Sequence, residues 1–333
     1  MHISIAMATY NGAAYIQDQL DSFLHQTRLP SELAVSDDGS TDETLNILHR
    51  FQSRAPFPVH IIEGQPRLGY AGNFGRALMA TKGDWVFLSD QDDVWFDNKI
   101  EVMLREAARH PHAQLVMCNA TLADQDMTKT RLTALGQTRT AGLPDTAFVL
   151  GCCMSIRRDL LQIALPIPAK FPSHDDWLIR IADGMKSKLI HAEPLQAYRR
   201  HGLNQSQSYI HRLTRVNRIT CFANRLHRLF HVALGHEQKT LKDILDMESM
   251  LLQAADRALA SRGEDNDHLF RFRNQQSKRV DILQRRKDAL RYRSWKRLFA
   301  IYRLWKNGDY ATFLGLATGV ADFLTPPLMS RDE

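Results

Sequence analysis

The sequence predicts an α/β fold with a mainly parallel sheet flanked by helices, followed by a helical C-terminal extension. Two observations lead to this prediction. The first half of the 333-residue chain alternates short apolar runs with helical patterns, which is the arrangement of βαβ units. After residue 205 strand patterns are absent, and long helical segments run to the end. We therefore expect two regions, residues 1–208 and residues 209–333.

The elements of the first region follow from these patterns in order. Five apolar runs are expected to be strands, at residues 3–9, 32–38, 59–64, 84–90 and 114–120. Between them, helical patterns lie near residues 13–27, 41–54, 71–82 and 97–109. The second helix has a good start signal, because the segment Ser40-Thr41-Asp42-Glu43 supplies a cap and acidic residues for the first turn.

Composition and charge narrow the class of protein. The 44% hydrophobic content is typical of a globular core, and the N-terminus lacks the basic and long apolar segments of a signal peptide. The four cysteines show no CxxC spacing, which favours reduced thiols in a cytosolic protein over a disulfide framework or a zinc site. Residues 1–204 hold 20 Lys+Arg against 23 Asp+Glu, whereas residues 205–333 hold 23 against 14. This asymmetry indicates different roles for the two halves.

The basic half contains an amphipathic segment, residues 279–306, which we expect to form a helix. It holds ten Lys+Arg and two acids. Large apolar side chains recur in it at helical spacing and share one face: Trp295, Leu298, Phe299, Tyr302 and Trp305. This pattern fits an anionic membrane surface, and also a helix that packs on the first region or on a second subunit. No nucleic-acid-binding module is recognised, so no nucleic acid partner is expected.

The apolar segment at residues 311–328 is a separate feature of this half. It contains Asp322 and ends in two prolines. A membrane-spanning helix needs about 20 predominantly apolar residues. We therefore expect this segment to be packed or interfacial and not transmembrane.

Polar loops follow three of the predicted strands. They read ATYNG (8–12), SDDGSTD (36–42) and SDQDD (89–93). The carboxyl ends of parallel strands meet at one edge of a sheet, and open sheets bind ligands there. Each loop alone has the composition of an ordinary turn. Their joint placement is what predicts a binding site.

The third of these loops carries a cluster of carboxylates, Asp90, Asp92 and Asp93, directly after an apolar run. If the strand continues, Asp90 and Asp92 point the same way and can face one cation. Carboxylate oxygens suit Mg²⁺ or Mn²⁺, and Mg²⁺ is usually held by one or two carboxylates together with substrate phosphates. The sparse ligation therefore predicts a diphosphate ligand. The alternative is a solvated acidic turn.

Four segments in order resemble glycosyltransferase family 2, whose members have the GT-A fold: MATYNG, VSDDGSTDETL, GYAGNFGRAL and GDWVFLSDQDDVW. The variant DQDDVW with its following NKI, and the later SHDDWL and YRRHGLNQS segments, are most similar to the rhamnosyltransferase-like branch. The resemblance covers about residues 1–208, and the combination of motifs is specific. It implies a GT-A catalytic domain over 1–208 and a helical basic region over 209–333.

The resemblance implies a nucleotide-sugar site at the polar loops. Thr9, Tyr10 and Asn11 would hold the base and ribose, with the Tyr10 ring stacking on a pyrimidine. Asp37 or Asp38 would accept a hydrogen bond from the base. Further contacts to the nucleotide sugar are expected from Arg67, Asn73, Asp90, Gln91 and Arg200.

The resemblance also implies a divalent cation, Mg²⁺ or Mn²⁺. Its expected ligands are Asp92, Asp90 and His201, while Asp93 stays open as a third acid. No catalytic role is expected for Cys152, which suits a packed strand.

The base of an inverting transfer is expected in the segment SHDDWL. The family motif reads Glu-Asp where this sequence has His174-Asp175. We expect Asp175 to be the base, with Asp176 a competitor because the doubled Asp leaves the register open. Capping of the helix N-terminus is the structural alternative for both.

Together these residues predict an inverting, metal-dependent glycosyltransferase. The expected donor is dTDP-rhamnose or a UDP-hexose, and the acceptor a saccharide or lipid-linked sugar in cell-surface polysaccharide synthesis (O-antigen, capsule or exopolysaccharide). We expect a cytoplasmic enzyme, peripheral at the inner face of the membrane, with the C-terminal helices offering a route to homo-oligomers.

Other functions are less well matched by the sequence. A nucleotidyltransferase would need a Gly-rich phosphate loop or a basic signature near the first strand, and ATYNG has no basic residue. A haloacid-type phosphatase would need aspartates directly after the first strand, and the ATYNG loop contains none. A non-catalytic sugar-nucleotide-binding protein would not need acids at both the cation and the base positions.

Overall fold

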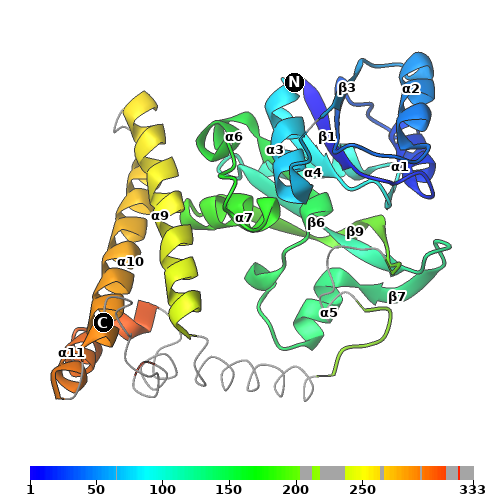
Figure 1. The fold of residues 1–333 in the computed structure, drawn as a ribbon. Helices are drawn as coiled ribbons and strands as arrows, with labels where there is room; N and C mark the ends of the chain where they lie inside the picture. Colours follow the sequence, from blue (N-terminus) through cyan, green and yellow to red (C-terminus); the bar gives the residue numbers. More distant parts are fainter. Residues whose placement is uncertain are drawn as a thin grey trace. The chain divides into compact units, whose positions relative to one another are not determined.

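The computed structural model divides into two compact units, Met1–Arg218 and Ile219–Glu333, coloured in chain order in Figure 1. The residues that it describes are 1–64, 66–202, 212–217, 237–262, 266–292, 295–312 and 322. The two units are treated separately below.

The first unit opens with the alternation that the sequence predicts. Its elements in order are β1 (Ile3–Thr9), α1 (Ile16–Leu24), β2 (Glu32–Asp37), α2 (Thr44–Arg54), β3 (Val59–Glu63), α3 (Gly69–Ala80) and β4 (Trp85–Ser89). The second helix begins at Thr44 and not at residue 41, because the Asp42 carboxylate bonds the Thr44 backbone N–H (3.0 Å) and Thr44 hydroxyl (2.5 Å) in the turn before it.

The rest of this unit adds five strands and four α-helices. They are β5 (Val94–Trp95), α4 (Lys99–Arg109), β6 (Leu115–Ala123), β7 (Lys129–Thr133), α5 (Ala134–Thr140), β8 (Met154–Arg157), α6 (Arg158–Ala164), α7 (His174–Gly184) and β9 (Lys188–Arg199). Two single 3₁₀ turns, Asp145–Ala147 and Gly151–Cys153, lie between α5 and β8.

Strands of the first unit join into one sheet whose order is β3-β2-β1-β4-β8-β6-β9-β5, with β7 paired to β6. The strands β3, β2, β1 and β4 are all parallel. Beyond β4 the directions are mixed, because β8 runs antiparallel to both β4 and β6 while β9 is parallel to β6. The predicted α/β fold with its parallel strands and flanking helices is confirmed.

The strand order creates a switch point beside β1. The chain moves from β1 to β2 and β3 on one side, and then crosses to place β4 on the other side of β1. Helices therefore cover both faces, and β2 and β4 are buried along their whole lengths. Ligands of open α/β sheets bind outside the carboxyl ends of the strands at such a point. Here those ends carry Thr9, which pairs with Asp37 of β2, and Ser89.

The second unit is helical in the part that the structure describes, as predicted for the extension. It contains α9 (Glu237–Arg262), α10 (Asp267–Arg291), α11 (Trp295–Lys306) and a 3₁₀ turn (Asp309–Thr312). A cluster of leucines joins α9 to α10: Leu241, Leu245, Leu283 and Leu290.

The expectation of one helix over 279–306 is wrong. Tyr292 has extended backbone angles (φ −71°, ψ 149°), and these end α10 before α11 starts at Trp295. Of residues 311–328, all but 311, 312 and 322 lie outside the described residues, so the expectation for that segment stays a prediction. No described helix combines the length and apolarity that crossing a bilayer requires.

Candidate active site

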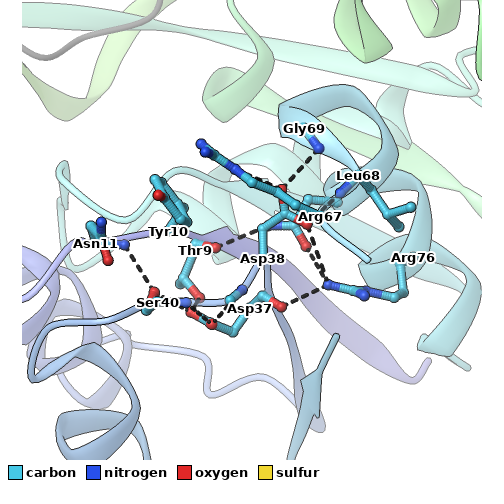
Figure 2. A network of polar contacts seen from close by, with 12 residues as sticks. Thr9, Tyr10, Asn11, Asp37, Asp38, Ser40, Arg67, Leu68, Gly69 and Arg76 are labelled. Carbon is cyan, nitrogen blue, oxygen red and sulfur yellow. Dashed lines mark hydrogen bonds and ion pairs between the residues drawn. The ribbon is translucent and has the colours of Figure 1, made fainter. Parts of the chain in front are cut away.

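The loops after β1 and β2 are joined by the buried carboxylate of Asp37 (Figure 2). It accepts hydrogen bonds from the Thr9 hydroxyl at 2.8 Å, the Ser40 backbone N–H at 2.7 Å, the Ser40 hydroxyl at 2.6 Å and the Gly39 N–H at 3.0 Å. Each of these bonds ties Asp37 to the rim of the sheet. Asp37 therefore shapes the loops around the expected nucleotide site, and its oxygens already serve protein donors.

Asp38 links the second loop to the start of α3 (Figure 2). Its two oxygens accept the backbone N–H groups of Leu68 and Gly69, both at 2.8 Å. The Arg67 Nε lies 3.7 Å from the same carboxylate. The Arg67 guanidinium stacks over the Tyr10 ring, 3.6 Å from its centroid. Asp38 thus positions the half-exposed guanidinium of Arg67 on the ring of Tyr10.

Behind this rim, Arg76 connects α3 to the end of β2. Its Nε donates to the Ser36 hydroxyl at 2.5 Å, and its Nη2 donates to the Asp37 carbonyl at 2.7 Å and to Asn73 Oδ1 at 3.2 Å. Asn73 is buried and donates to the Thr9 carbonyl at 3.0 Å. Asn73 therefore braces the first loop from below. Arg76 was not foreseen as part of this network, and its only signal in the sequence is a cation inside the GNFGRAL segment.

The first loop is also fixed from the acidic side. The Gln91 amide pairs with the Tyr10 backbone in both directions, through Tyr10 N–H to Oε1 at 2.9 Å and Nε2 to the Tyr10 carbonyl at 3.0 Å. Asn11 has a positive φ of 46°, which Asn tolerates better than most residues, and its Oδ1 accepts the Thr41 N–H at 2.8 Å. Gln91 and Asn11 hold the three polar loops at one edge, as the strand pattern predicts.

The three clustered acids have different surroundings. The partly buried Asp90 has its pKa raised to about 7, by burial and then by the negative charges of Asp92 and Asp175. Asp92 Oδ2 lies 2.8 Å from His201 Nε2. Asp93 is fully buried and accepts hydrogen bonds from the Arg199 backbone N–H at 3.0 Å and from Gln196 Nε2 at 2.8 Å. Asp92 thus pairs with His201, Asp90 lies near Asp93 and Cys152, and Asp93 anchors the loop to β9.

A buried polar layer lies under the acids and was not foreseen. Lys99 is completely buried, and its ammonium donates to the Cys152 carbonyl at 2.8 Å and to Gln196 Oε1 at 2.5 Å. Gln196 Nε2 also reaches Cys152 Sγ at 3.1 Å. One ligand atom each of Asp90, Asp93 and Cys152 lies within 4.8 Å of the others. The lysine supplies positive charge beneath carboxylates that burial would otherwise destabilise.

The end of β9 supplies cations to this side of the rim. The Arg199 guanidinium donates to the Asp92 carbonyl at 2.7 Å, the Gln125 carbonyl at 2.6 Å and the Asp18 carboxylate at 2.6 Å. Arg200 follows, with its guanidinium 5.6 Å from the Tyr198 ring centroid. Arg199 thus holds the loop at residues 89–93 in place through the Asp92 carbonyl. The structure brings His201 to Asp92, while Arg200 contacts Tyr198.

The two candidates for the base differ in their partners. Ser173 caps α7, with its hydroxyl bonded to the Asp175 carboxylate. Asp176 Oδ2 lies 2.7 Å from Arg180 Nε one turn along the helix, in an ion pair. Asp175 is close enough to Asp90 for its charge to raise the Asp90 pKa, and it also raises the Tyr70 pKa. Asp175 thus shares the electrostatic environment of the acidic loop, whereas Asp176 is engaged along its own helix.

His174 is an unexpected feature beside Asp175. Its ring is buried and stacks on Phe74, with centroids 4.0 Å apart and an interplanar angle of 21°. Neither ring nitrogen has a hydrogen-bond partner among the described residues. A Cβ added to Gly151 would lie 2.9 Å from His174 Nε2 and 3.4 Å from the Asp175 Cβ. Gly151 therefore leaves room for these two side chains.

The burial of His174 predicts a loss of stability in mild acid. Burial lowers the pKa of His174 to about 4, against a weaker opposing effect of the Asp175 charge. The unfolded chain takes up this proton below about pH 6.5, so between these values protons favour the unfolded state and stability falls as the pH falls. This group should cost about 2 kcal/mol of unfolding free energy between about pH 7 and pH 5.

Urea unfolding at the two pH values measures this cost. The variant His174→Leu should lose about 2 kcal/mol less than the wild type between the two values. The variant His25→Leu, which changes an exposed histidine at the end of α1, should keep the wild-type dependence. An unchanged pH dependence in His174→Leu would show that His174 is not the group responsible.

The residues present fit a divalent cation. Asp90 and Asp92 offer carboxylate oxygens, and His201 offers an imidazole nitrogen already within 2.8 Å of Asp92. Mn²⁺ and Mg²⁺ accept oxygen ligands, and Mn²⁺ also accepts imidazole. Burial first, and then the charges of Asp92 and Asp175, raise the pKa of Asp90, and a bound cation would oppose the effect of those charges. Among the described residues, the donor atoms that lie within 4.8 Å of one another are those of Asp90, Asp93 and Cys152, of which Asp93 and Cys152 are fully buried. The pair of Asp92 and His201 does not form such a group with Asp90.

Comparison with known proteins decides the family. Residues 4–163 match the model for glycosyl transferase family 2. Residues 4–163 belong to glycosyltransferase family 2. This domain spans the strands β1 to β8 and the polar loops of the rim. The predicted family and its GT-A fold are confirmed.

Two relatives have glycosyltransferase names. The dTDP-rhamnosyl transferase RfbG of Shigella flexneri is 40% identical over 99 residues, which are 28% of this chain and 34% of that protein. An uncharacterized glycosyltransferase of Nostoc is 28% identical over 219 residues, 62% of this chain and 67% of that protein. The chain therefore spans about a third of the length of the first relative and two thirds of the second.

A solved structure supports the architecture of the family 2 domain and its extension. The S. aureus TarS fragment 1–349, determined in complex with UDP, has a TM-score of 0.52 to this chain. Its sequence identity is 16%, and the match covers 84% of this chain and 92% of that one. At this identity the similarity is one of fold.

Proposed function

We propose that this protein is an inverting, metal-dependent glycosyltransferase that transfers a sugar from a nucleotide-diphosphate donor to a saccharide or lipid-linked acceptor. The observation that carries the proposal is geometric. A Cβ on Gly151 would lie 3.4 Å from the Asp175 Cβ of α7. The next residue, Cys152, has its thiol in one cluster with the carboxylate of Asp90, from the loop after β4. A prospective base and prospective cation ligands therefore lie on the same side of one rim. The family 2 domain gives the reaction type.

The donor is proposed to be dTDP-rhamnose, with a UDP-hexose as the alternative. The named function of the Shigella relative supports the first choice. Thr9, Tyr10 and Asn11 would form the base and ribose side of the pocket. Asp37 and Asp38 would act mainly by holding these loops in place, because their oxygens already accept protein hydrogen bonds. Both donors carry a pyrimidine that could stack on the cation–π pair of Tyr10 and Arg67.

Asp90, Asp92 and His201 would hold a Mn²⁺ or Mg²⁺ ion. When bound, this ion supplies positive charge to the diphosphate of the donor and of the leaving group. Arg199 would keep Asp92 in position through the Asp92 carbonyl. Arg200 is proposed as a further cation toward the diphosphate, at the end of β9 next to His201.

Asp175 is proposed as the base. It would take the proton of the acceptor hydroxyl while the hydroxyl oxygen bonds to the anomeric carbon of the donor. The bond from that carbon to the diphosphate breaks, and the nucleoside diphosphate leaves from the opposite face, so that the configuration inverts. The logic is that of single displacement by an activated hydroxyl. Gly151 and His174 would form the wall beside this base.

The acceptor is proposed to belong to cell-surface polysaccharide synthesis, with the enzyme acting from the cytoplasm at the inner face of the membrane. The relative named as a rhamnosyl transferase, and others named chondroitin and hyaluronan synthases, support a polysaccharide product. The chain covers 34%, 11% and 10% of these relatives, so they support the reaction class and not a shared substrate.

Incubation with labelled nucleotide sugars, Mn²⁺ and saccharide acceptors tests the proposal. We expect a nucleoside diphosphate to be released and the label to appear in a larger product. Release of pyrophosphate from a nucleoside triphosphate and a sugar phosphate would instead identify a nucleotidyltransferase. Binding of nucleotide sugars without turnover in the presence of any acceptor tried would favour the non-catalytic alternative.

A further inference from the structure

The helix α11 exposes a continuous face of large apolar side chains in the second unit. Its members, which we call the aromatic face, are 52–68% exposed: Trp295, Leu298, Phe299, Tyr302 and Trp305. They recur every three or four residues, so they lie on one side of the helix. Two of the rings are in contact, since the centroids of Tyr302 and Trp305 are 6.3 Å apart. Isolated exposed apolar residues are ordinary, but a contiguous group of this kind marks an interaction surface.

The opposite side of α11 packs against the rest of the second unit, so the helix is held in place. Leu304 is buried in a cluster with Ala289 of α10 and with Tyr310. Arg297 is buried and bonds the Asp322 carbonyl. The Asp322 carboxylate accepts a bidentate pair from Arg286 of α10, at 2.8 and 2.7 Å. These contacts fix the rotation of α11 about its axis, and with it the direction of the aromatic face.

Within α11 the aromatic face is accompanied by basic residues and by no acid. The sequence of α11 contains four basic residues and no Asp or Glu. Three of the basic residues are exposed: Lys296, Arg303 and Lys306. None of the three forms an ion pair with a described residue, in contrast to Arg285 and Arg286 of α10. Their charge is therefore available to a partner.

We infer that the aromatic face of α11 is a membrane-docking surface that binds the interface of an anionic lipid bilayer. Tryptophan and tyrosine rings have an apolar body and a polar edge, and they favour the boundary between lipid tails and headgroups. Lysine and arginine beside them meet acidic headgroups, which is the pattern of a helix lying in the interface. Twelve residues are too few to span a bilayer but enough to lie on one.

A second copy of the chain is the competing occupant, and the charge argues against it. A two-fold interface formed by α11 would bring two helices with four basic and no acidic residues each against one another. An anionic bilayer neutralises the same charges. The inference adds a binding surface to the proposed function and uses none of the proposed catalytic residues.

Flotation of the full chain with lipid vesicles tests the inference, in the absence of any donor or acceptor. We expect binding to vesicles of phosphatidylcholine mixed with phosphatidylglycerol, and at least roughly tenfold weaker binding to phosphatidylcholine alone. The triple variant Trp295→Ser, Phe299→Ser, Trp305→Ser should lose binding to both. The variant Lys296→Gln, Arg303→Gln, Lys306→Gln should lose the preference for the anionic vesicles and most of its salt dependence.

The control is Phe270→Ser on α10, which removes an aromatic side chain that is 40% exposed outside the aromatic face. It should bind the mixed vesicles like the wild type. The inference is overturned if the wild type fails to float with the mixed vesicles, or if the aromatic variant floats as well as the wild type. Loss of a wild-type dimer in the aromatic variant, without vesicle binding by the wild type, would assign the face to a second copy. Donor binding should be the same in all variants, so that a failure here is separate from a failure of the proposed function.

Discussion

Replacing Asp175 by Asn is expected to reduce sugar transfer by about three orders of magnitude while donor binding stays within about twofold of the wild type. The amide has nearly the shape of the carboxylate and can still interact with the Ser173 hydroxyl, but it cannot take the proton of the acceptor. The loss should therefore appear in kcat. Initial rates with a labelled donor, together with donor affinity from isothermal titration, measure the two effects separately.

Asp176→Asn is the matched control for this prediction. It makes the same chemical change one residue along α7, at a carboxylate engaged with Arg180 at 2.7 Å. We expect it to keep most of the transfer activity. If Asp176→Asn loses transfer and Asp175→Asn does not, the two roles are exchanged. If both variants stay fully active, the base lies elsewhere and the proposed mechanism is wrong.

Replacing Asp92 by Ala is expected to remove the effect of Mn²⁺ on donor binding. In the presence of Mn²⁺, the affinity for the donor should fall by about a hundredfold or more. The change deletes one carboxylate of the proposed cation site and leaves His201 without its partner at 2.8 Å. Affinity for the donor in the presence of chelator should change little, because the loops at Thr9 and Asp37 are not altered. Titration of the donor with Mn²⁺ and with chelator gives both numbers.

The control is Asp97→Ala, an exposed acid a few residues further along the same segment. It removes the same charge from the neighbourhood without touching the rim, and it should bind the donor with the wild-type dependence on Mn²⁺. A wild-type response to Mn²⁺ in Asp92→Ala would exclude Asp92 as a ligand. The cluster of Asp90, Asp93 and Cys152 would then be the next donor set to examine.

Much of the first unit could be predicted from local patterns. Apolar runs and helical spacing are properties of short segments, so the strands β1 to β4 and the helices between them were found within a few residues. The common edge of the loops at residues 8–12, 36–42 and 89–93 followed from the rule that parallel strands end together. The same rule could not foresee β8, because whether a strand enters antiparallel between β4 and β6 depends on distant pairing partners.

The parts of the site that the sequence missed depend on contacts between distant residues. Nothing near Lys99 or Gln196 predicts that they meet under Asp93, since 97 residues separate the two. The contact of Asp92 with His201 spans 109 positions and was suggested only by family resemblance. The break at Tyr292 was missed because the basic and aromatic pattern continues through it, while the extended backbone of Tyr292 ends α10.

The same reasoning explains why the roles of individual rim residues shifted. From the sequence, Asp37, Asn73 and Gln91 are polar side chains beside a binding site, and polar side chains there can serve a ligand or the loop. The structure gives each of them protein partners, in the Ser40 N–H, the Thr9 carbonyl and the Tyr10 backbone. Their contribution is therefore to hold the shape of the rim.

The most direct test of the central claim is a thermal-shift measurement with nucleotide sugars, with and without Mn²⁺. A ligand that binds only the folded state increases the free energy of unfolding by mass action, by about 2.7 kcal/mol at a hundredfold excess over Kd, and so raises the unfolding temperature. We expect dTDP-rhamnose or a UDP-hexose to raise the midpoint by about 5 °C with Mn²⁺ and much less with chelator. No shift with any nucleotide sugar, or the same shift with and without Mn²⁺, would contradict a cation-assisted nucleotide-sugar site at this rim.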